Sequence, residues 1–367
     1  METTEYVARF LAERDIAFER APSGTGGVAR VGAGEPVVLL RADLDALPVE
    51  ERTGAACRSR HPGRMHACGH DAHAAMLLAA ADALQGGDAP CRGTVVCLFQ
   101  PAEEGSGGCR RLLRDGLLHR HPVRAAAALH VWPGLPTGSV GLTPGPVMAG
   151  MDNLRLTVRG RGGHGAHPHH CADPVVMAAQ GVLAFQTLVS RSTNPLDPAV
   201  LTVGSIRGGS APNVIPDEVV LDGTIRAYDA AVRQGLLEGI ERVGRGIAAA
   251  HGGTFELAVR EGYPATVNDP AATEALSRAF QEVLPPGALR PAERTMGSED
   301  MGFLLGQVPG GYLQLGCAAD PRRAEPLHSP RFDIDESCLE VGVAVLLTAA
   351  WALGRWVETA SAGPERG

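Results

Sequence analysis

The sequence lacks a surplus of positive charge. Its 33 lysines and arginines are outnumbered by 41 aspartates and glutamates, which gives a formal net charge of -8. Proteins that bind nucleic acids usually carry a basic surplus, so we do not expect a nucleic-acid partner. Long apolar runs are also missing: no stretch reaches the length of a transmembrane helix, and residues 1–10 contain acids and no apolar signal-peptide core. We therefore expect a protein that neither crosses nor binds a membrane.

The sequence also lacks paired cysteines. Its eight cysteines are scattered along the chain, with no CxxC pair and no dense framework. Small secreted domains depend on closely spaced cysteines for disulfides, whereas scattered cysteines are typical of a reducing compartment. The pattern favours free thiols and a cytoplasmic protein.

The first part of the chain alternates strand and helix patterns. At 367 residues, the chain is long enough for two domains, and 44% of its residues are hydrophobic. Short apolar runs predict buried strands at 37–40 and 94–99, an Ala/Leu-rich segment predicts a helix at 73–84, and a short helix is expected at 110–118. The run at 125–129 fits a third strand, although a run of alanines alone would favour a helix. Such alternation indicates an α/β domain with a mostly parallel sheet covered on both faces.

A different pattern begins near residue 151. The predicted elements are a strand at 154–158, a helix at 173–188 with Asp173 as its N-cap, strands at 199–206 and 218–228, a helix at 229–250 and a strand at 254–259. This β-α-β-β-α-β order is that of a ferredoxin-like domain. The α/β pattern resumes with a helix from Asp269, a strand at 311–316 and a helix at 336–357. We expect one domain formed by residues 1–150 and 263–367, with an α+β domain of residues 151–262 inserted into it.

Two clusters of polar residues follow predicted strands or begin predicted helices. Cys68 and His70 lie in the segment MHACGHDAH, and thiolate and imidazole are the usual ligands of zinc-like ions. Glu103 and Glu104 directly follow the strand at 94–99, where one acid can bind a metal ion while its neighbour acts as a general base. Alone, each cluster fits a blander interpretation, exposed histidines at a helix start or a solvated acidic turn.

Further candidates lie at other strand ends. His130 ends the strand at 125–129, His328 lies in PLHSP, and Asp43 and Asp45 follow the first strand. A lone histidine is more often a hydrogen-bonded structural residue than a ligand. However, the carboxyl ends of parallel strands meet at one edge of a sheet, so we expect these side chains to converge there. One cysteine, three histidines and one glutamate suffice to hold two ions.

Taken together, these segments resemble the M20 metallopeptidase clan, and within it the amidohydrolase branch that includes hippurate hydrolases, N-acyl-L-amino acid amidohydrolases and auxin-conjugate hydrolases. The resemblance covers nearly the whole chain in the right order, through RADLDALP, MHACGHDAH, QPAEEG, HVWP, GGHGAHP, NVIP, GSEDMGF and PLH. It implies a metallohydrolase domain with an inserted lid, two divalent metal ions (Zn, Mn, Co or Ni), and hydrolysis of the amide bond of N-acyl amino acids. Relatives carry a further helix before the segment that resembles residues 2–16.

The resemblance also assigns roles. Cys68 would bridge the two ions; the other ligands would be His70, Glu104, His130 and His328. Glu103 would be the general base, and Asp43, Asp45 and Asp71 would orient the ligands. From the lid, His164 would polarise the scissile carbonyl, often across a dimer interface, while Asn213 and Arg226 would help to hold the substrate. A homodimer formed through the lid is therefore expected.

Three competing interpretations remain at this point. Cys68 could be the nucleophile of a thiol enzyme with a histidine partner, although such an enzyme needs neither Glu103 nor His328. The chain could be a binding module on an inactive hydrolase scaffold, against which the intact Glu103 argues. Within the enzyme class, a dipeptidase or carboxypeptidase is the nearest rival.

Overall fold

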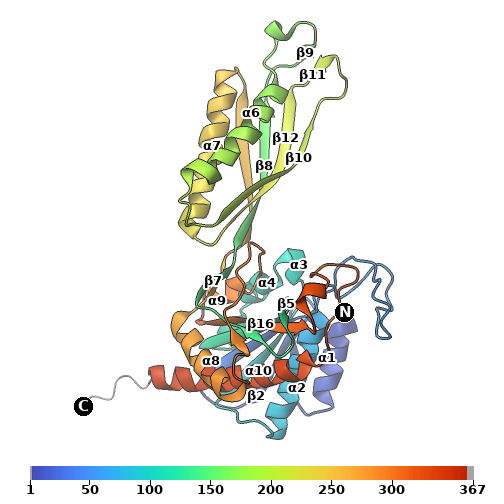
Figure 1. The fold of residues 1–367 in the computed structure, drawn as a ribbon, viewed down its shortest axis with the longest axis vertical. Coiled ribbons are helices and arrows are strands. Elements are labelled where there is room, and N and C mark those ends of the chain that lie inside the picture. Colours follow the sequence, from blue (N-terminus) through green and yellow to red (C-terminus); the bar gives the residue numbers. More distant parts are fainter. Residues whose placement is uncertain (1, 362–367) are drawn as a thin grey trace, which may run out of the picture. The chain divides into compact units, whose positions relative to one another are not determined.

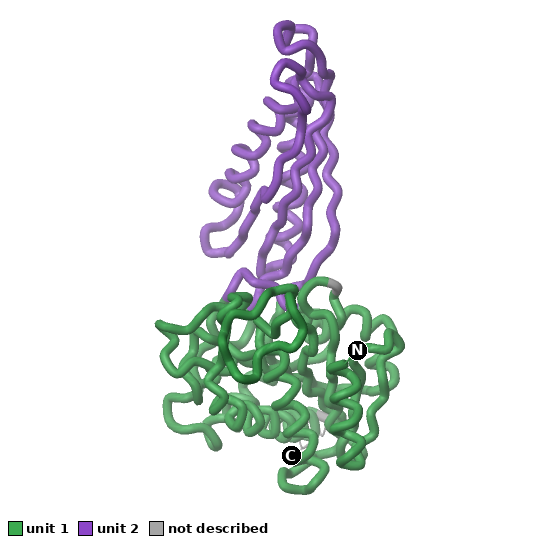
Figure 2. The backbone as a smooth tube through the Cα atoms, turned by 90° about the vertical axis from the view of Figure 1, so that its right-hand side faces the viewer, with its two compact units in different colours: residues 1–147, 266–294, 300–367 green, residues 148–265, 295–299 purple. Residues whose placement is uncertain are grey.

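The computed structural model describes residues 2–361, which form two compact units. Unit 1 comprises residues 1–147, 266–294 and 300–367, and unit 2 comprises residues 148–265 and 295–299 (Figure 2). The sequence predicts boundaries after residues 150 and 262, and these units divide after residues 147 and 265. The segment Thr295–Glu299, expected in the α/β domain, is grouped with unit 2.

Unit 1 is built on an eight-stranded sheet whose central strands β4, β3, β5 and β16 are parallel (Figure 1). The remaining strands continue the sheet at its two sides. In sheet order, the strands are β1 (Phe18–Arg20), β2 (Gly27–Gly32), β4 (Thr94–Gln100), β3 (Val37–Asp43), β5 (Ala125–Pro136), β16 (Gly310–Ala318), β6 (Val140–Gly141) and β15 (Leu289–Arg290). Every residue of β3, β4 and β16 is buried, as expected for parallel strands covered on both faces.

Helices of unit 1 cover this sheet, and α2, α8 and α10 pack on one another or on its strands. The helices are α1 (Glu2–Ala12), α2 (His70–Gly86), α3 (Glu103–Ser106), α4 (Gly108–Arg114), α5 (Leu117–Arg120), α8 (Pro270–Val283), α9 (Gly302–Leu305) and α10 (Cys338–Ser361), with a 3-10 turn at Pro321–Arg323. The single helix predicted at 110–118 is wrong. Gly116 adopts a left-handed φ of 86° between α4 and α5, and this conformation ends one helix and starts the next.

Helix α10 corrects one expectation from the sequence. Its segment Cys338–Ala360 is long and apolar enough to cross a membrane, by length and composition alone. Half of this segment is buried inside unit 1, where the helix packs against α2, α8 and β5. A buried core helix can be as long and as apolar as a membrane-spanning helix. The burial of α10 explains why so many apolar residues occur together in it.

Unit 2 has the ferredoxin-like order predicted from the sequence. Its antiparallel sheet runs β10-β12-β8-β13, and its two long helices pack on that sheet. The elements are β8 (Gly150–Arg159), α6 (Pro174–Thr187), β10 (Ala199–Gly208), β12 (Glu218–Ala227), α7 (Ala230–Ala250) and β13 (Thr254–Tyr263), with the short pair β9 (Gly163–His164) and β11 (Val214–Ile215). A 3-10 turn (Pro168–His170) precedes α6, and a π-helical turn (Leu188–Ser192) follows it. In unit 1, β14 (Thr266–Asn268) pairs with β7 (Gly145–Met148), of which only Met148 is grouped with unit 2.

Both long helices of unit 2 begin at aspartate caps. The Asp173 side chain accepts a hydrogen bond from Val175 N, and the Asp229 side chain accepts from the first amides of α7. These bonds satisfy amides that have no partner within the helix.

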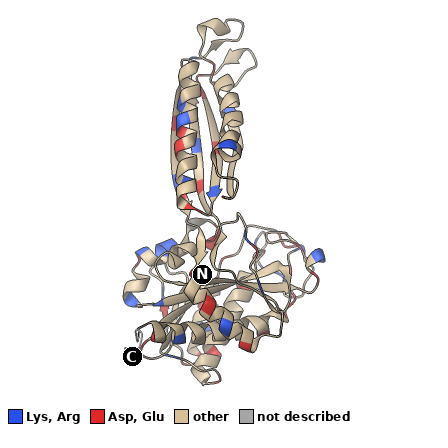
Figure 3. Cartoon of the chain, turned by 60° about the vertical axis from the view of Figure 1, so that its left-hand side comes forward, with Lys and Arg blue, Asp and Glu red and all other residues tan. Residues whose placement is uncertain are grey.

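Figure 3 marks the charged residues, whose positive members are all arginines because the sequence contains no lysine. A lysine base or nucleophile is therefore excluded.

Candidate metal centre

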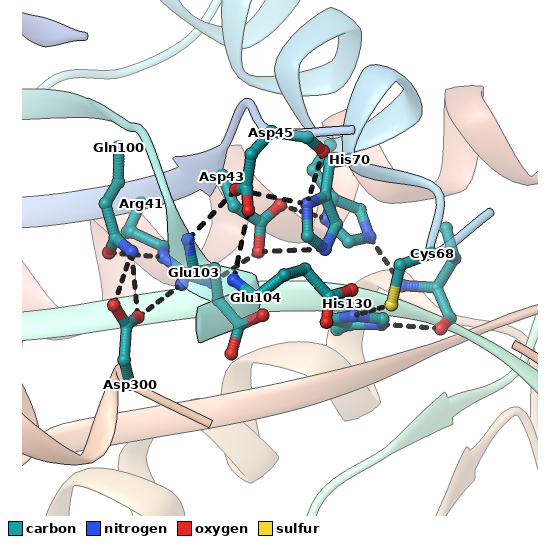
Figure 4. A network of polar contacts seen from close by, with 12 residues as sticks. Arg41, Asp43, Asp45, Cys68, His70, Gln100, Glu103, Glu104, His130 and Asp300 are labelled. Carbon is teal, nitrogen blue, oxygen red and sulfur yellow. Dashed lines mark hydrogen bonds and ion pairs between the residues drawn. The ribbon is translucent and has the colours of Figure 1, made fainter. Parts of the chain in front are cut away.

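The candidate ligands of unit 1 converge at the carboxyl ends of its parallel strands (Figure 4). Strand β3 ends at Asp43, β4 leads into Glu103 and Glu104 at the start of α3, and β5 carries His130. Parallel strands that share one direction bring their ends to the same edge of the sheet. This edge joins residues that are up to 87 positions apart in the sequence, from Asp43 to His130.

Cys68 and His70 enter this edge from the start of α2. Gly69 between them is the N-cap and has a left-handed φ of 81°, which only glycine adopts without strain. A Cβ at this position would lie 2.4 Å from Cγ2 of Val131. Gly69 therefore allows the helix start to approach β5 closely, and this brings Cys68 Sγ to 3.4 Å from His130 Nε2.

The ligand atoms form overlapping groups. Cys68, His70 and His130 make one group, and Cys68, Glu104 and His328 make a second; within each group, the ligand atoms all lie within 4.8 Å of one another. Cys68 belongs to both, as a ligand between two ions would. His328 approaches from a loop, where its Nε2 lies 3.0 Å from Glu104 Oε1 and its amide donates to Ala67 O. Its own backbone is left-handed, with a φ of 69°.

The two buried histidines present lone pairs that fit a cation. His70 Nδ1 lies 3.0 Å from the carbonyl oxygen of Asp45, and His130 Nδ1 lies 2.7 Å from that of Val131. A carbonyl only accepts, so each Nδ1 carries a proton, and in the neutral ring Nε2 has the lone pair that can bind a metal ion. Within residues 2–361, the buried Nε2 of His70 has no hydrogen-bond partner. With the nearby thiol and carboxylate, this donor set fits zinc-like divalent ions.

Asp45 holds three of these groups at once. Its two carboxylate oxygens each accept a hydrogen bond of 3.0 Å, one from Glu103 N and one from Glu104 N. Its backbone carbonyl accepts a hydrogen bond from His70 Nδ1. Burial would raise the pKa of the Asp45 carboxyl, but the hydrogen bond and charge of His70, together with both amides, lower it. Asp45 therefore stays ionised and fixes the start of α3 relative to His70.

Asp43 lies deeper, in a fully buried network that the sequence did not reveal. Arg41 Nη1 lies 2.7 Å from Asp43 and its Nη2 lies 2.9 Å from Asp300, while Gln100 donates to Asp300 and accepts from Arg41. Burial alone would raise the pKa of Asp43, but His70, Arg41 and His73 hold it well below its ordinary value. Asp43 is thus held by Arg41 and His73, beside the candidate ligand His70. The sequence signals for Arg41, Gln100 and Asp300 were their places in RADLDALP, QPAEEG and GSEDMGF.

Asp71 does not share this arrangement. It is exposed on the first turn of α2, where its carboxylate accepts from the amide of Ala72. Among the described residues, it forms no hydrogen bond with a candidate ligand. Asp45, by contrast, contacts His70, Glu103 and Glu104. The orienting roles of Asp43, Asp45 and Asp71 stay predictions.

The local electrostatics argue against a thiol nucleophile. Burial and the charges of Glu104, Asp43 and Glu103 raise the pKa of the Cys68 thiol far above its ordinary value. Burial lowers the pKa of His130 to about 4 even though Asp43 opposes this effect. A reactive cysteine needs a depressed pKa beside a protonated histidine, which is the opposite arrangement. Cations, by contrast, deprotonate a coordinating thiol outright, so the site suits a metal-bound thiolate.

The remaining predicted residues lie in unit 2. His164 is exposed in β9, which pairs with β11, and the amide of Gly165 donates to Asn213 O at 2.8 Å. His164 and Asn213 are therefore neighbours. Arg226 lies at the other end of β12, where its Nη1 donates to Met296 O and Ser298 Oγ.

Comparisons with known proteins agree on one family. The model of Peptidase family M20/M25/M40 matches residues 39–352. N-acetyl-L-cysteine deacetylase of Bacillus subtilis is 40% identical over 92% of this chain and 80% of its own length. IAA-amino acid hydrolase ILR1-like 4 of Arabidopsis thaliana is 38% identical over 94% of this chain and 79% of its own length.

Solved structures give the same result. The YXEP protein of Bacillus subtilis, described as a dinuclear metal-binding peptidase of family M20, superposes with a TM-score of 0.85 at 32% identity. The match covers 96% of this chain and 92% of that protein. The resemblance inferred from the motifs is thus confirmed, together with the fold of a mostly parallel α/β domain carrying a lid. The chain belongs to the M20/M25/M40 peptidase family of metal-binding hydrolases.

Proposed function

We propose that this protein is a metal-dependent amidohydrolase that cleaves N-acyl-L-amino acids, hippurate-like or N-acetylated, into a carboxylate and a free amino acid. The observation that carries the proposal is the donor set around Cys68, with the carboxylate of Glu103 beside it as the candidate base. Similarity to an N-acetyl-L-cysteine deacetylase and to an IAA-amino acid hydrolase supports this substrate class.

The proposed ligands are Cys68, His70, Glu104, His130 and His328, with Cys68 shared between two ions. When bound, two divalent ions would supply Lewis acidity and lower the pKa of a water molecule toward neutrality. Glu103 is buried at the same sheet edge, and its carboxylate lies within 4.8 Å of ligand atoms of His70 and Glu104. This places it within reach of a water held there.

Glu103 then moves a proton twice. It accepts the proton of the attacking water, whose oxygen forms a bond to the amide carbon, and later delivers that proton to the leaving nitrogen as the C–N bond breaks. His164 of the lid donates a hydrogen bond to the carbonyl oxygen as negative charge develops on it; such a donor typically contributes about 3 kcal/mol. Arg226 and Asn213 hold the substrate, with the arginine suited to its carboxylate.

The substrate test is a panel of N-acetyl-, N-benzoyl- and dipeptide substrates, assayed for released amino acid with manganese- or zinc-loaded protein. We expect release from acyl amino acids and its loss after chelation. Glu103→Gln should bind metal normally but lose turnover by about 10²–10⁴-fold, because the amide cannot shuttle the proton. Near-normal turnover in that variant would refute the role of Glu103, and preferential cleavage of dipeptides would favour a peptidase. Bound metal without any product would favour a binding module.

All eight cysteines are free in the structure, which fits the reducing cytoplasm in which we place the enzyme.

We also propose a homodimer that forms through the lid. Its support is the distribution of lid residues along β12, where Glu218, beside the β9–β11 pair, and Arg226 are separated by eight strand positions. At about 3.3 Å per residue, the two ends lie roughly 26 Å apart. We therefore infer that His164 and Arg226 reach one site from two lids, one of each subunit.

A further inference from the structure

One buried histidine beside the metal centre has no role in the reaction described above. His73 lies in α2, one turn after His70, and its side chain is only 1% exposed. Its Nδ1 lies 2.6 Å from Asp43 Oδ1, and its Nε2 lies 2.9 Å from the backbone amide of Val131. The imidazole thus joins the Asp43 network to strand β5.

The directions of these two bonds are fixed. A backbone amide can only donate, so Nε2 of His73 accepts from Val131 N. The proton of the neutral ring is then on Nδ1, which donates to Asp43. Asp43 is itself held by Arg41, whose guanidinium also contacts Asp300. His73 is therefore a link in a buried chain of polar contacts that begins at Asp300 and Arg41.

The other end of this chain is the candidate ligand His130. Val131 is held through its N–H by His73, and its carbonyl accepts from His130 Nδ1 at 2.7 Å. The rings of His73 and His130 also contact, with centroids 4.5 Å apart. The orientation of His130, and with it the direction of its Nε2 toward Cys68, thus depends on where Val131 is held.

We propose that His73 is a positioning residue that anchors Val131 and thereby aims His130 at the metal centre. This inference rests on the proposed function only in taking His130 as a ligand. Residues that orient metal ligands typically contribute 10- to 100-fold to metal affinity. The competing explanation is that His73 merely fills the core, in which case any similar side chain would serve equally.

Two amide variants separate these explanations. In His73→Asn, the short amide reaches the position of Nδ1 and keeps a donor for Asp43, but nothing accepts from Val131 N. In His73→Gln, the longer side chain places its amide oxygen near the position of Nε2 and restores that acceptor. His121→Asn is the matched control, because His121 is another buried histidine of unit 1 and lies outside this network.

Two readouts are needed, both independent of catalysis. The first is hydrogen exchange of the peptide that contains Val131 in metal-free protein, and the second is Co²⁺ affinity by chelator competition. For His73→Asn, we expect faster exchange around Val131 and about 10- to 100-fold weaker Co²⁺ binding. His73→Gln should recover most of both, and His121→Asn should change neither.

Equal behaviour of the Asn and Gln variants would overturn the proposal, as would wild-type Co²⁺ affinity in His73→Asn. If the Asn variant does not fold, the Gln variant decides alone. Its Co²⁺ affinity must then change together with the protection of Val131 from hydrogen exchange. Normal Co²⁺ affinity despite lost protection of Val131 would refute the proposal that His73 acts through Val131. A wild-type protein that binds Co²⁺ but hydrolyses no acyl amino acid would count against the proposed function and leave this inference intact.

Discussion

At the scale of single residues, Asp45 connects three groups of the site at once. It fixes Glu103 and Glu104 through its carboxylate and His70 through its carbonyl. In Asp45→Asn, one amide N–H would face another donor, so one of the two bonds is lost. We expect metal affinity to fall by about 10- to 100-fold. Asp71→Asn is the matched control, because it removes an exposed carboxylate from the residue next to His70. Its metal affinity, measured by chelator competition, should not change.

Proton release on metal binding is a second prediction at this scale. Burial and nearby carboxylates raise the pKa of Cys68. Burial alone would lower the pKa of His70, but the charges of Asp43 and Asp45 outweigh this effect and raise the pKa of His70 to about 9. Both groups are therefore protonated near pH 7 in metal-free protein. Cations and protons compete for the same atoms, so apparent affinity must rise with pH, by up to about tenfold per pH unit for each proton displaced.

This release can be measured by calorimetry in buffers of different ionisation enthalpy between pH 6.5 and 8.5. The expected slope of log affinity against pH is positive and approaches about two below pH 9, because Cys68 and His70 each lose a proton. His328, whose pKa is raised by its hydrogen bond with Glu104, adds to this slope at the lower end of the range. His130 should not contribute, since burial lowers its pKa to about 4 and it is already neutral. A slope near one would mean that only one of Cys68 and His70 releases a proton, and a pH-independent affinity would mean that neither does.

The sequence predicted which residues meet, but not all that holds them. Cys68, His70 and His130 were predicted to converge because each lies at a strand end or helix start. His73 could not be assigned, because its two partners are 30 and 58 positions away in the chain. The contact between Arg41 and Asp300 spans 259 positions, and no local pattern reports it.

At the scale of elements, the close approach of α2 to β5 depends on Gly69. Gly69→Ala would add a left-handed φ penalty and a Cβ at 2.4 Å from Val131. We expect the free energy of unfolding to fall by about 2–4 kcal/mol, the sum of strain and overpacking. Gly87→Ala, at the other end of α2, has a φ of 80° but meets nothing within 4 Å, so it should cost only about 1–2 kcal/mol.

Denaturant unfolding of the three metal-free proteins measures this difference. The excess cost at Gly69 over Gly87 reports the contact with Val131, since the backbone strain is common to both. Equal destabilisation of the two variants would show that α2 can move away from β5 without loss. In that case the approach of Cys68 to His130 would not depend on the glycine.

Elements with long apolar runs or clear caps were predicted, whereas α1, β2 and the shortest strands were missed. The apolar runs of β3 and β4 and the capped helices α6 and α7 have clear patterns, and each was found. Strands β1, β6 and β15 have only two or three residues, which is too short for any periodicity, and pairing in the sheet alone defines them. Strand β5 continues to Pro136, beyond the predicted end at Leu129, because it pairs with β16 through the segment after His130.

At the scale of the whole molecule, the lid residues raise the question of which subunit serves which site. His164 and Asn213 lie at the β9–β11 pair, and Arg226 lies beside Met151, where the chain enters unit 2. Arg226 is held there by Met296 and Ser298 of the same unit. If each active site needs both ends of a lid, two lids must contribute, one from each subunit of a closed dimer.

Mixing two inactive variants tests this arrangement. Glu103→Gln removes the base and His164→Ala removes the lid histidine, so each homodimer should be inactive. In a mixed dimer, the site that keeps Glu103 receives His164 from the other subunit, while the second site lacks both. Random reassociation of equal amounts makes half of the dimers mixed, each with one working site, so about a quarter of wild-type activity should return. Mass photometry of size-tagged chains can verify that the subunits exchange. If they exchange and the activity stays at the level of the homodimers, His164 acts within its own chain or has no role in catalysis.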